Sequence, residues 1–153
     1  MKIHKQRGYT LVEMVVVLAI VGLLAALTVA IFNLQKVNNF NKQSEELVSA
    51  LRKAQSQAAT GENNDEYGIS FSSGSYTTYR IDTATATQTS IATTTVSGTT
   101  ISTSITPSAS QVTFLRVSGQ TKNATSATIT MTLNGTSRTK VIIVNAAGQI
   151  YVQ

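Results

Sequence analysis

The feature that most constrains this chain is an unbroken apolar run of 24 residues near its start. The run extends from Tyr9 to Phe32 and contains a single charged side chain, that of Glu13. As a helix it would be about 36 Å long, enough to cross a hydrocarbon core of about 30 Å. Val and Ile are frequent in it, but a lone segment in lipid satisfies its backbone polar groups only as a helix. The run therefore predicts a helix in a membrane.

The residues before this run are basic. Lys2, Lys5 and Arg7 supply three charges in a chain whose net charge is +5, so the side chains that follow carry only +2. The basic isoelectric point is thus weak support for nucleic-acid binding. A basic flank before an apolar run is the usual cytoplasmic anchor of a membrane segment.

Three interpretations of this N-terminal part compete. A secretory signal peptide would have an apolar region of about 7–15 residues that ends in small residues at a cleavage site. Here the run is longer, and Asn33-Leu34-Gln35 follows it. A plain membrane anchor fits the length but gives no reason for Glu13. The third interpretation is a segment that is cut on its N-terminal, cytoplasmic side.

The residues from Arg7 to Glu13 carry a resemblance that favours the third interpretation. They read Arg-Gly-Tyr-Thr-Leu-Val-Glu and are similar to the class III signal of type IV prepilins and type II secretion pseudopilins. In that family a prepilin peptidase cuts after the Gly and methylates the new amino terminus, and the fifth mature residue is Glu. The resemblance implies cleavage between Gly8 and Tyr9, N-methylation of Tyr9 and an assembly role for Glu13. The chain departs from the family in having Tyr9 for the usual Phe and no proline in the run, because Pro107 is its only proline.

Glu13 is the residue on which assembly would depend. A carboxylate at the centre of a bilayer helix costs about 2.5–3.5 kcal/mol on insertion scales, so it needs a partner. The resemblance implies that Glu13 pairs with the terminal ammonium of Tyr9 in a neighbouring subunit. The alternative is that Glu13 lies at the interface and is solvated by lipid headgroups.

Beyond Phe32 the pattern becomes amphipathic. One helix face is marked by residues three and four apart: Val37, Phe40, Ser44, Leu47, Leu51, Ala54 and Ala58. Gly61 is a plausible helix stop in the left-handed conformation. The pattern predicts a helix from about Thr10 to Thr60, about 75 Å long. We expect the stripe to pack on the chain's own C-terminal domain and the first half to find lipid or other subunits.

The rest of the chain shows strand patterns rich in Thr, Val, Ile and Tyr. Two hairpins are predicted around Ser72-Ser73-Gly74 and Asn134-Gly135. The strand candidates are 67–71, 76–81, 112–117, 127–133, 139–144 and 150–152. Residues 83–110, almost all Thr, Ser and Ala, leave two alternatives: two strands near 91–96 and 99–105, or a mobile surface loop. We expect a small antiparallel sheet against the second half of the helix.

This layout resembles the minor-pseudopilin group called GspH/FimT-like. In that group the same helix precedes a β-rich domain that ends in a strand turn containing glycine. Gly148-Gln149-Ile150-Tyr151 occupies the corresponding place here. The likeness is loose over residues 62–153 and specific over the first 32.

The sequence offers few residues for catalysis or for binding a metal ion. His4, the only histidine, lies in the predicted leader, and the chain has no cysteine for a disulfide or a thiolate site. Glu62, Asp65 and Glu66 could offer oxygens to Ca²⁺, but their spacing is not that of an EF-hand and favours a solvated turn. We predict no enzyme, no cofactor and no metal site.

Two further surface patterns have alternative interpretations. Asn123-Ala124-Thr125 and Asn134-Gly135-Thr136 match the N-glycosylation pattern, although the second is better explained as a turn. Four basic residues could form a DNA-binding patch or simply be solvated: Arg116, Lys122, Arg138 and Lys140. No aromatic residue lies between them, which favours solvation.

The sequence thus predicts an α+β, pilin-like fold in which a long N-terminal helix packs on a small antiparallel β-sheet domain. We expect a leader at 1–8, a helix at 9–60 that is transmembrane or in the filament core over 9–32, and a β-rich domain at 61–153.

The predicted function is a structural subunit, a minor pilin or pseudopilin, of a type IV pilus or type II secretion pseudopilus. Its predicted partners are like subunits, prepilin peptidase and inner-membrane lipid. Alternatives are a DNA-uptake minor pilin, with DNA as partner, and a single-span surface adhesin without a filament. We expect a single-pass inner-membrane protein with its C-terminal domain outside the cytoplasm, later part of a filament in the periplasm or at the surface.

Overall fold

The computed structural model describes residues 9–106, 110–122 and 126–153, with the backbone alone for residues 28–30. Gly8, Pro107 and the candidate acceptor Asn123 therefore lie outside the described residues. The chain forms two compact units, Met1–Asn38 and Asn39–Gln153, which are described separately.

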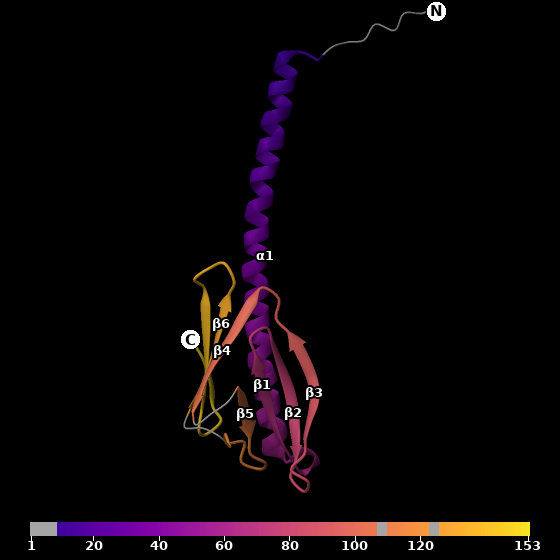
Figure 1. Cartoon of the computed structure of the whole chain (residues 1–153). Coiled ribbons are helices and arrows are strands. Elements are labelled where there is room, and N and C mark those ends of the chain that lie inside the picture. The colour runs from indigo at the N-terminus through magenta and orange to yellow at the C-terminus, as the bar shows by residue number, and fades with distance from the viewer. Residues whose placement is uncertain (1–8, 107–109, 123–125) are drawn as a thin grey trace, which may run out of the picture. The chain divides into compact units, whose positions relative to one another are not determined.

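One helix, α1 (Leu11–Thr60), contributes its first half to the first unit and its second half to the second (Figure 1). These bounds agree with the helix predicted from Thr10 to Thr60. The helix ends at Gly61, whose φ of 67° is left-handed and whose N–H donates to the Ala58 carbonyl at 3.0 Å. Glycine adopts this conformation without the steric cost that a Cβ imposes. A short 3-10 turn, η1 (Glu62–Asn64), follows.

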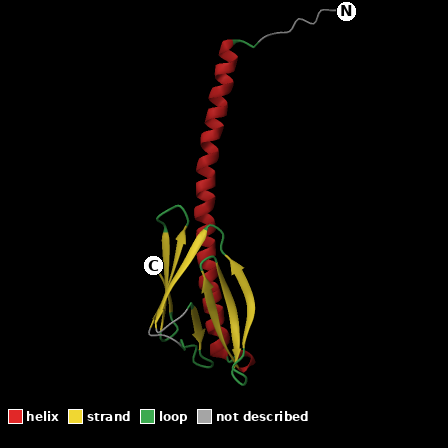
Figure 2. Cartoon of the chain, viewed as in Figure 1, coloured by secondary structure: helices red, strands yellow, loops and turns green. Residues whose placement is uncertain are grey.

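Eight strands occur in the described part of the chain (Figure 2). They form two four-stranded antiparallel sheets, in the orders β3-β2-β1-β5 and β4-β6-β7-β8. In Figure 1, β4 and β6 lie to the left of β1, β2 and β3. The strand bounds are β1 Asp65–Ser72, β2 Ser75–Asp82, β3 Gln88–Thr95, β4 Thr99–Thr106, β5 Gln111–Phe114, β6 Ser126–Leu133, β7 Thr139–Asn145 and β8 Ile150–Val152.

The α+β class with a long helix on antiparallel strands is confirmed, but two sheets replace the single small sheet expected. The reason lies within residues 83–110, where Gln88–Thr95 and Thr99–Thr106 form two strands, the first of the two alternatives. β3 pairs with β2 in one sheet, and β4 pairs with β6 in the other. Both predicted hairpins are present, β1–β2 and β6–β7. β5 is shorter than predicted, because Val117 has a φ of 70° and donates its N–H to the Ala58 carbonyl.

The core of the second unit is built on the predicted stripe of α1. Leu47, Leu51, Ala54 and Ala58 are fully buried, and Phe40 and Ser44 nearly so. Each buried Leu side chain is worth about 1.5–3 kcal/mol relative to exposure. The strands contribute alternate residues, as expected where one sheet face is covered. These are chiefly Tyr67, Ile69, Phe71, Val112 and Phe114 from one sheet, and Ile101, Ile129, Met131, Ile142 and Val144 from the other.

A tyrosine crosses the first sheet above a glycine. Gly68 of β1 lies opposite Tyr79 of β2, and a Cβ on Gly68 would be 2.6 Å from the Tyr79 ring carbon Cζ. The buried Tyr79 hydroxyl is 2.6 Å from Thr113 Oγ1, also buried. Burial raises the pKa of Tyr79, and the contact with Thr113 partly opposes this. The absence of a side chain at Gly68 therefore makes room for a buried polar pair.

Replacing Tyr79 by Phe should lower the free energy of unfolding by about 1–3 kcal/mol, because Thr113 Oγ1 loses its partner. Thermal unfolding followed by circular dichroism measures this change. Tyr151 is exposed, so the control variant Tyr151→Phe should keep a free energy of unfolding within about 0.5 kcal/mol of wild type. A folded-state pKa above the ordinary value of about 10 means that the unfolded chain ionises first. The contribution of Tyr79 is thus constant below about pH 10 and is lost as pH rises further. Equal unfolding temperatures for the Tyr79 and Tyr151 variants would contradict this account.

A second glycine allows the turn before β8 to pack closely against other parts of the second unit. Gly148 precedes β8 and has a φ of 83°. A Cβ there would lie 2.2 Å from the Gly119 carbonyl oxygen and 2.7 Å from Gln55 Nε2 of α1. Close by, Thr121 donates its N–H to the Ala146 carbonyl at 3.1 Å. The glycine that sequence analysis singled out thus lies where three segments meet.

Candidate functional site

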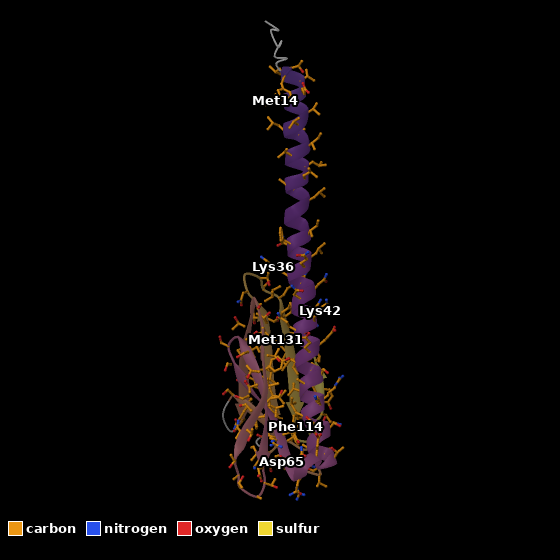
Figure 3. The ribbon with its side chains drawn as sticks, turned by 90° about the vertical axis from the view of Figure 1, so that its right-hand side faces the viewer. Met14, Lys36, Lys42, Asp65, Phe114 and Met131 are labelled. Atoms are coloured by element: carbon orange, nitrogen blue, oxygen red, sulfur yellow. The ribbon has the colours of Figure 1, made fainter. Side chains whose placement is uncertain are left out.

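The first unit presents apolar side chains that the chain itself does not bury. Along α1 from Leu11 to Leu27, every residue is exposed, and Leu11 and Leu18 are 80% and 67% exposed. Figure 3 shows the side chains around Met14 projecting from the ribbon. By length and composition this part of the helix can cross a membrane. A soluble chain rarely leaves so large an apolar surface open, so this segment requires lipid or other helices.

Glu13 lies in the first turn of α1, three residues after Thr10. The Thr10 hydroxyl accepts the Glu13 N–H at 3.3 Å, and the Met14 N–H donates to the Thr10 carbonyl at 3.2 Å. Thr10 is therefore the N-cap, in the Thr-x-x-Glu pattern of a capping box. Thr10 was not among the predicted site residues, although the Thr-x-x-Glu spacing signals this role. The helix N-terminus also favours a negative charge at Glu13.

The Glu13 carboxylate has no hydrogen bond or ion pair within the described part of the chain. Tyr9, the predicted new amino terminus, is 78% exposed. The predicted processing residues are thus presented without a competing partner among the described side chains. Gly8, on the other side of the predicted cut, lies outside the described residues.

The acidic residues after the helix do not form the solvated turn that we expected. Asp65 and Glu66 begin β1 and are buried, at 6% and 8% exposure. Arg80 Nη1 lies 3.5 Å from Asp65 Oδ2, and Lys122 Nζ lies 2.7 Å from Glu66 Oε2. The interpretation is wrong for these two residues because distant cations neutralise them, whereas Glu62 is exposed. No group of three metal-ligating side chains occurs among the described residues.

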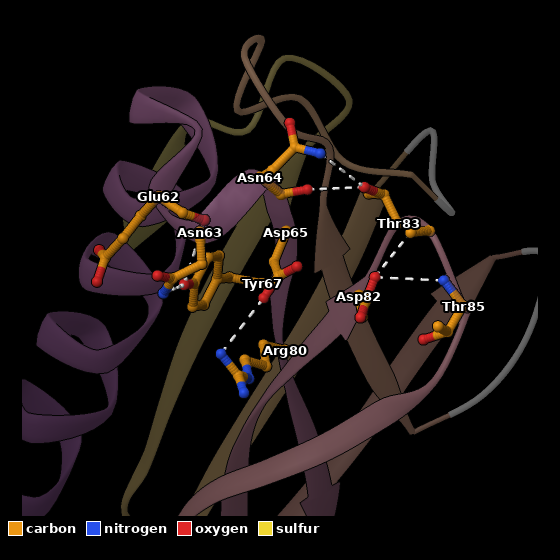
Figure 4. A network of polar contacts seen from close by, with 10 residues as sticks. Glu62, Asn63, Asn64, Asp65, Tyr67, Arg80, Asp82, Thr83 and Thr85 are labelled. Atoms are coloured by element: carbon orange, nitrogen blue, oxygen red, sulfur yellow. Dashed lines mark hydrogen bonds and ion pairs between the residues drawn. The ribbon is translucent and has the colours of Figure 1, made fainter.

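A network of polar contacts surrounds this start of β1 (Figure 4). Asp82 accepts the N–H groups of Ala84 and Thr85 at 2.8 and 3.2 Å, which lowers the pKa of Asp82. Thr83 donates its hydroxyl to the Asn64 carbonyl at 2.7 Å. The Thr83 contact joins the β2–β3 loop to Asn64, whose φ of 63° is positive.

The four basic residues considered as a DNA patch have separate roles. Arg116 donates to Asn64 Oδ1, and Lys122 pairs with Glu66. Lys140 lines a groove of about 350 Å³ between α1 and β8, together with Arg52 and Val152. Arg138 is exposed in the β6–β7 loop. Two of the four side chains are thus engaged in contacts within the domain.

Comparisons with known proteins agree with this arrangement. Residues 3–29 match the prokaryotic N-terminal methylation motif, and residues 43–148 match the type II transport protein GspH. The fold is similar to that of the minor pseudopilin EpsH from the type 2 secretion system of Vibrio cholerae. One such structure is 12% identical, with a TM-score of 0.58 over 74% of this chain and 94% of that one. A second, a crystal structure of the same pseudopilin, is 11% identical, with a TM-score of 0.58 over 75% and 93%.

A search of curated proteins found no match. The structural likeness, at so low an identity, shows the fold. The family match extends over more than half of the chain and includes the second half of α1 and most of both sheets. The family and the fold are those of structural pilin and pseudopilin subunits. The chain therefore belongs to the GspH family of type II transport proteins and begins with a prokaryotic N-terminal methylation motif.

Proposed function

We propose that this protein is a minor pseudopilin, a structural subunit that assembles through its N-terminal helix into a type II secretion pseudopilus or a related type IV filament. The observation that carries the proposal is the exposed apolar half of α1, which has one carboxylate, Glu13, in its first turn. Family membership and the methylation motif support it. The domain at residues 61–153 would then remain outside the cytoplasm.

The proposed precursor lies across the inner membrane as a single span. Residues 1–8 carry the basic flank and stay on the cytoplasmic side, as expected for Lys and Arg near a membrane segment. Residues 9–32 occupy the bilayer. A prepilin peptidase then cuts between Gly8 and Tyr9 and methylates the Tyr9 amine.

Assembly would move this helix from lipid into a bundle of like helices. Its apolar surface is covered in both places, so apolar burial supplies little net driving force. The charge of Glu13 behaves differently, because in lipid it costs about 2.5–3.5 kcal/mol and in the bundle it meets an ammonium. We propose that the Tyr9 amine of a neighbouring subunit is this partner, and that the pair sets the register between subunits. The DNA-uptake and adhesin alternatives stay untested predictions.

The cut is tested by the intact mass of the full chain purified from cells with and without an active prepilin peptidase. With the enzyme, we expect loss of the mass of residues 1–8 and gain of one methyl group at Tyr9. Without it, the chain should begin at Met1. A chain that still begins at Met1 in the presence of the active enzyme would refute the processing step and leave an anchored β-rich domain.

A further inference from the structure

The β6–β7 loop exposes an asparagine followed by a glycine. Asn134 and Gly135 are exposed, and Gly135 has a φ of 77°. Three hydrogen bonds between backbone groups hold the loop. Leu133 N–H donates to the Arg138 carbonyl at 3.0 Å, Thr136 N–H to the Leu133 carbonyl at 3.2 Å, and Asn134 N–H to the Gly98 carbonyl at 2.9 Å.

The backbone nitrogen of Gly135 is a free nucleophile. Among the contacts of the described residues, its N–H donates no hydrogen bond. No atom lies within 4 Å of the position that a Cβ would take on Gly135. The residue after an asparagine can attack the side-chain amide through its nitrogen and form a five-membered ring, and a side chain at that residue hinders the approach. Gly135 has neither this hindrance nor a competing hydrogen bond.

The side-chain amide of Asn134 is polarised by a neighbouring strand. Thr100 Oγ1 of β4 donates to Asn134 Oδ1 at 2.7 Å. A donor at this oxygen draws electron density from Cγ and stabilises the negative charge that develops on the oxygen during attack. The pairing of Thr100 with Thr132 fixes the strand beside the loop. A nucleophile and an activated carbonyl thus belong to adjacent residues.

We propose that Asn134 is a site of spontaneous modification, at which the chain converts its own asparagine to aspartate or isoaspartate. The Gly135 nitrogen forms a bond to Asn134 Cγ, the bond from Cγ to Nδ2 breaks, and the proton of the Gly135 amide leaves with the ammonia. Water then opens the cyclic imide at one of its two carbonyls. The net reaction consumes one water and releases one ammonia, without an oxidant or a second substrate.

The product places a negative charge where the sheet has none. Neither β4 nor β6 contains a charged residue, and their paired positions are occupied largely by Ser and Thr. The modified residue lies in the loop, outside the paired positions of β6 and β7, which begin with Thr132 and Thr139. The sheet register therefore survives the change, while the loop gains a carboxylate that offsets the charge of the exposed Arg138. An ageing subunit would carry a surface that a new one lacks.

The experiment incubates the full chain, in a neutral detergent, at mildly alkaline pH, where more of the Gly135 amide is deprotonated. Peptide mapping by mass spectrometry then follows replacement of the amide nitrogen by oxygen. We expect progressive conversion at Asn134 and none at Asn145, whose amide is held at both ends by Gln149 and whose successor is Ala146. Asn134→Gln should abolish the conversion, and Gly135→Ala should slow it strongly because its side chain hinders the attack.

Variants of Thr100 test the activation. Thr100→Val should slow conversion about threefold to tenfold, the worth of one hydrogen bond, and Thr100→Ser should retain the wild-type rate. Circular dichroism of each variant checks the fold. The proposal is overturned if Asn134 stays intact in the wild type, if Gly135→Ala converts as fast, or if Thr100→Val does not slow the reaction. Because no outcome depends on filament formation, failure here leaves the proposed function standing.

Discussion

Replacement of Glu13 by Val is expected to abolish incorporation of the subunit into filaments while the protein stays in the membrane. Glu13 is exposed in the first turn of α1, and its carboxylate has no partner among the described residues. In the bilayer, removal of the charge relieves up to about 2.5–3.5 kcal/mol, the cost of a charge at the centre of the span, and Val adds a favourable few tenths of a kcal/mol. The substitution therefore stabilises the subunit in the membrane and removes the ion pair that stabilises it in the filament. The balance should shift toward the membrane by about a hundredfold or more.

The measurement is the share of the subunit in sheared, sedimented filaments, compared with the share in the membrane fraction, by immunoblot. Val12→Ala is the matched control, because it alters the neighbouring side chain without touching the charge and should assemble as the wild type does. Glu13→Gln keeps the shape and removes the charge, and should also fail. Normal assembly of Glu13→Val would refute the ammonium pairing, whereas absence of the wild-type subunit from filaments would favour the adhesin alternative.

Gly148→Ala is expected to destabilise the second unit by about 2–5 kcal/mol. Two costs add. The left-handed φ of 83° is unfavourable by about 1–2 kcal/mol for a residue with a Cβ. The new Cβ would also lie 2.2 Å from the backbone oxygen of Gly119, and crowding of this kind costs about 1–3 kcal/mol because backbone must shift.

The chain offers a matched control for this substitution. Gly135 has a similar φ of 77°, but nothing lies within 4 Å of its Cβ position. Gly135→Ala should therefore show only the conformational cost, about 1–2 kcal/mol. Thermal unfolding of the full chain in detergent, followed by circular dichroism, compares the two. Equal shifts in unfolding temperature would mean that the contact with Gly119 relaxes freely and that crowding has no part in the effect.

Local signals in the sequence accounted for much of the fold. The apolar run and the periodic stripe predicted α1, since both depend on residues three or four apart in one helix. Gly61 predicted the end of the helix through its own backbone freedom. Asn134-Gly135 predicted the β6–β7 hairpin, because the turn type is chosen by the residues within it. The candidate assembly residue Glu13 was predicted because its charge is unusual in an apolar run.

The features that escaped prediction depend on partners far away in the sequence. Thr and Ser in residues 83–110 favour strands, but nothing in that composition says that β3 and β4 join different sheets. Asp65 and Glu66 looked solvated because their partners, Arg80 and Lys122, are 15 and 56 residues distant. A buried carboxylate is acceptable only where such a cation is supplied. The fold of the sheet decides which cation pairs with each buried carboxylate.

The division of α1 between two compact units has a mechanical consequence. The helix is a single hydrogen-bonded element, and its last turns are covered by the strands that it helps to bury. Leu47 and Leu51 anchor this end of the helix in the hydrophobic core of the second unit. Force applied along the end of α1 would therefore be resisted by core packing, because withdrawal of these turns exposes apolar surface to water.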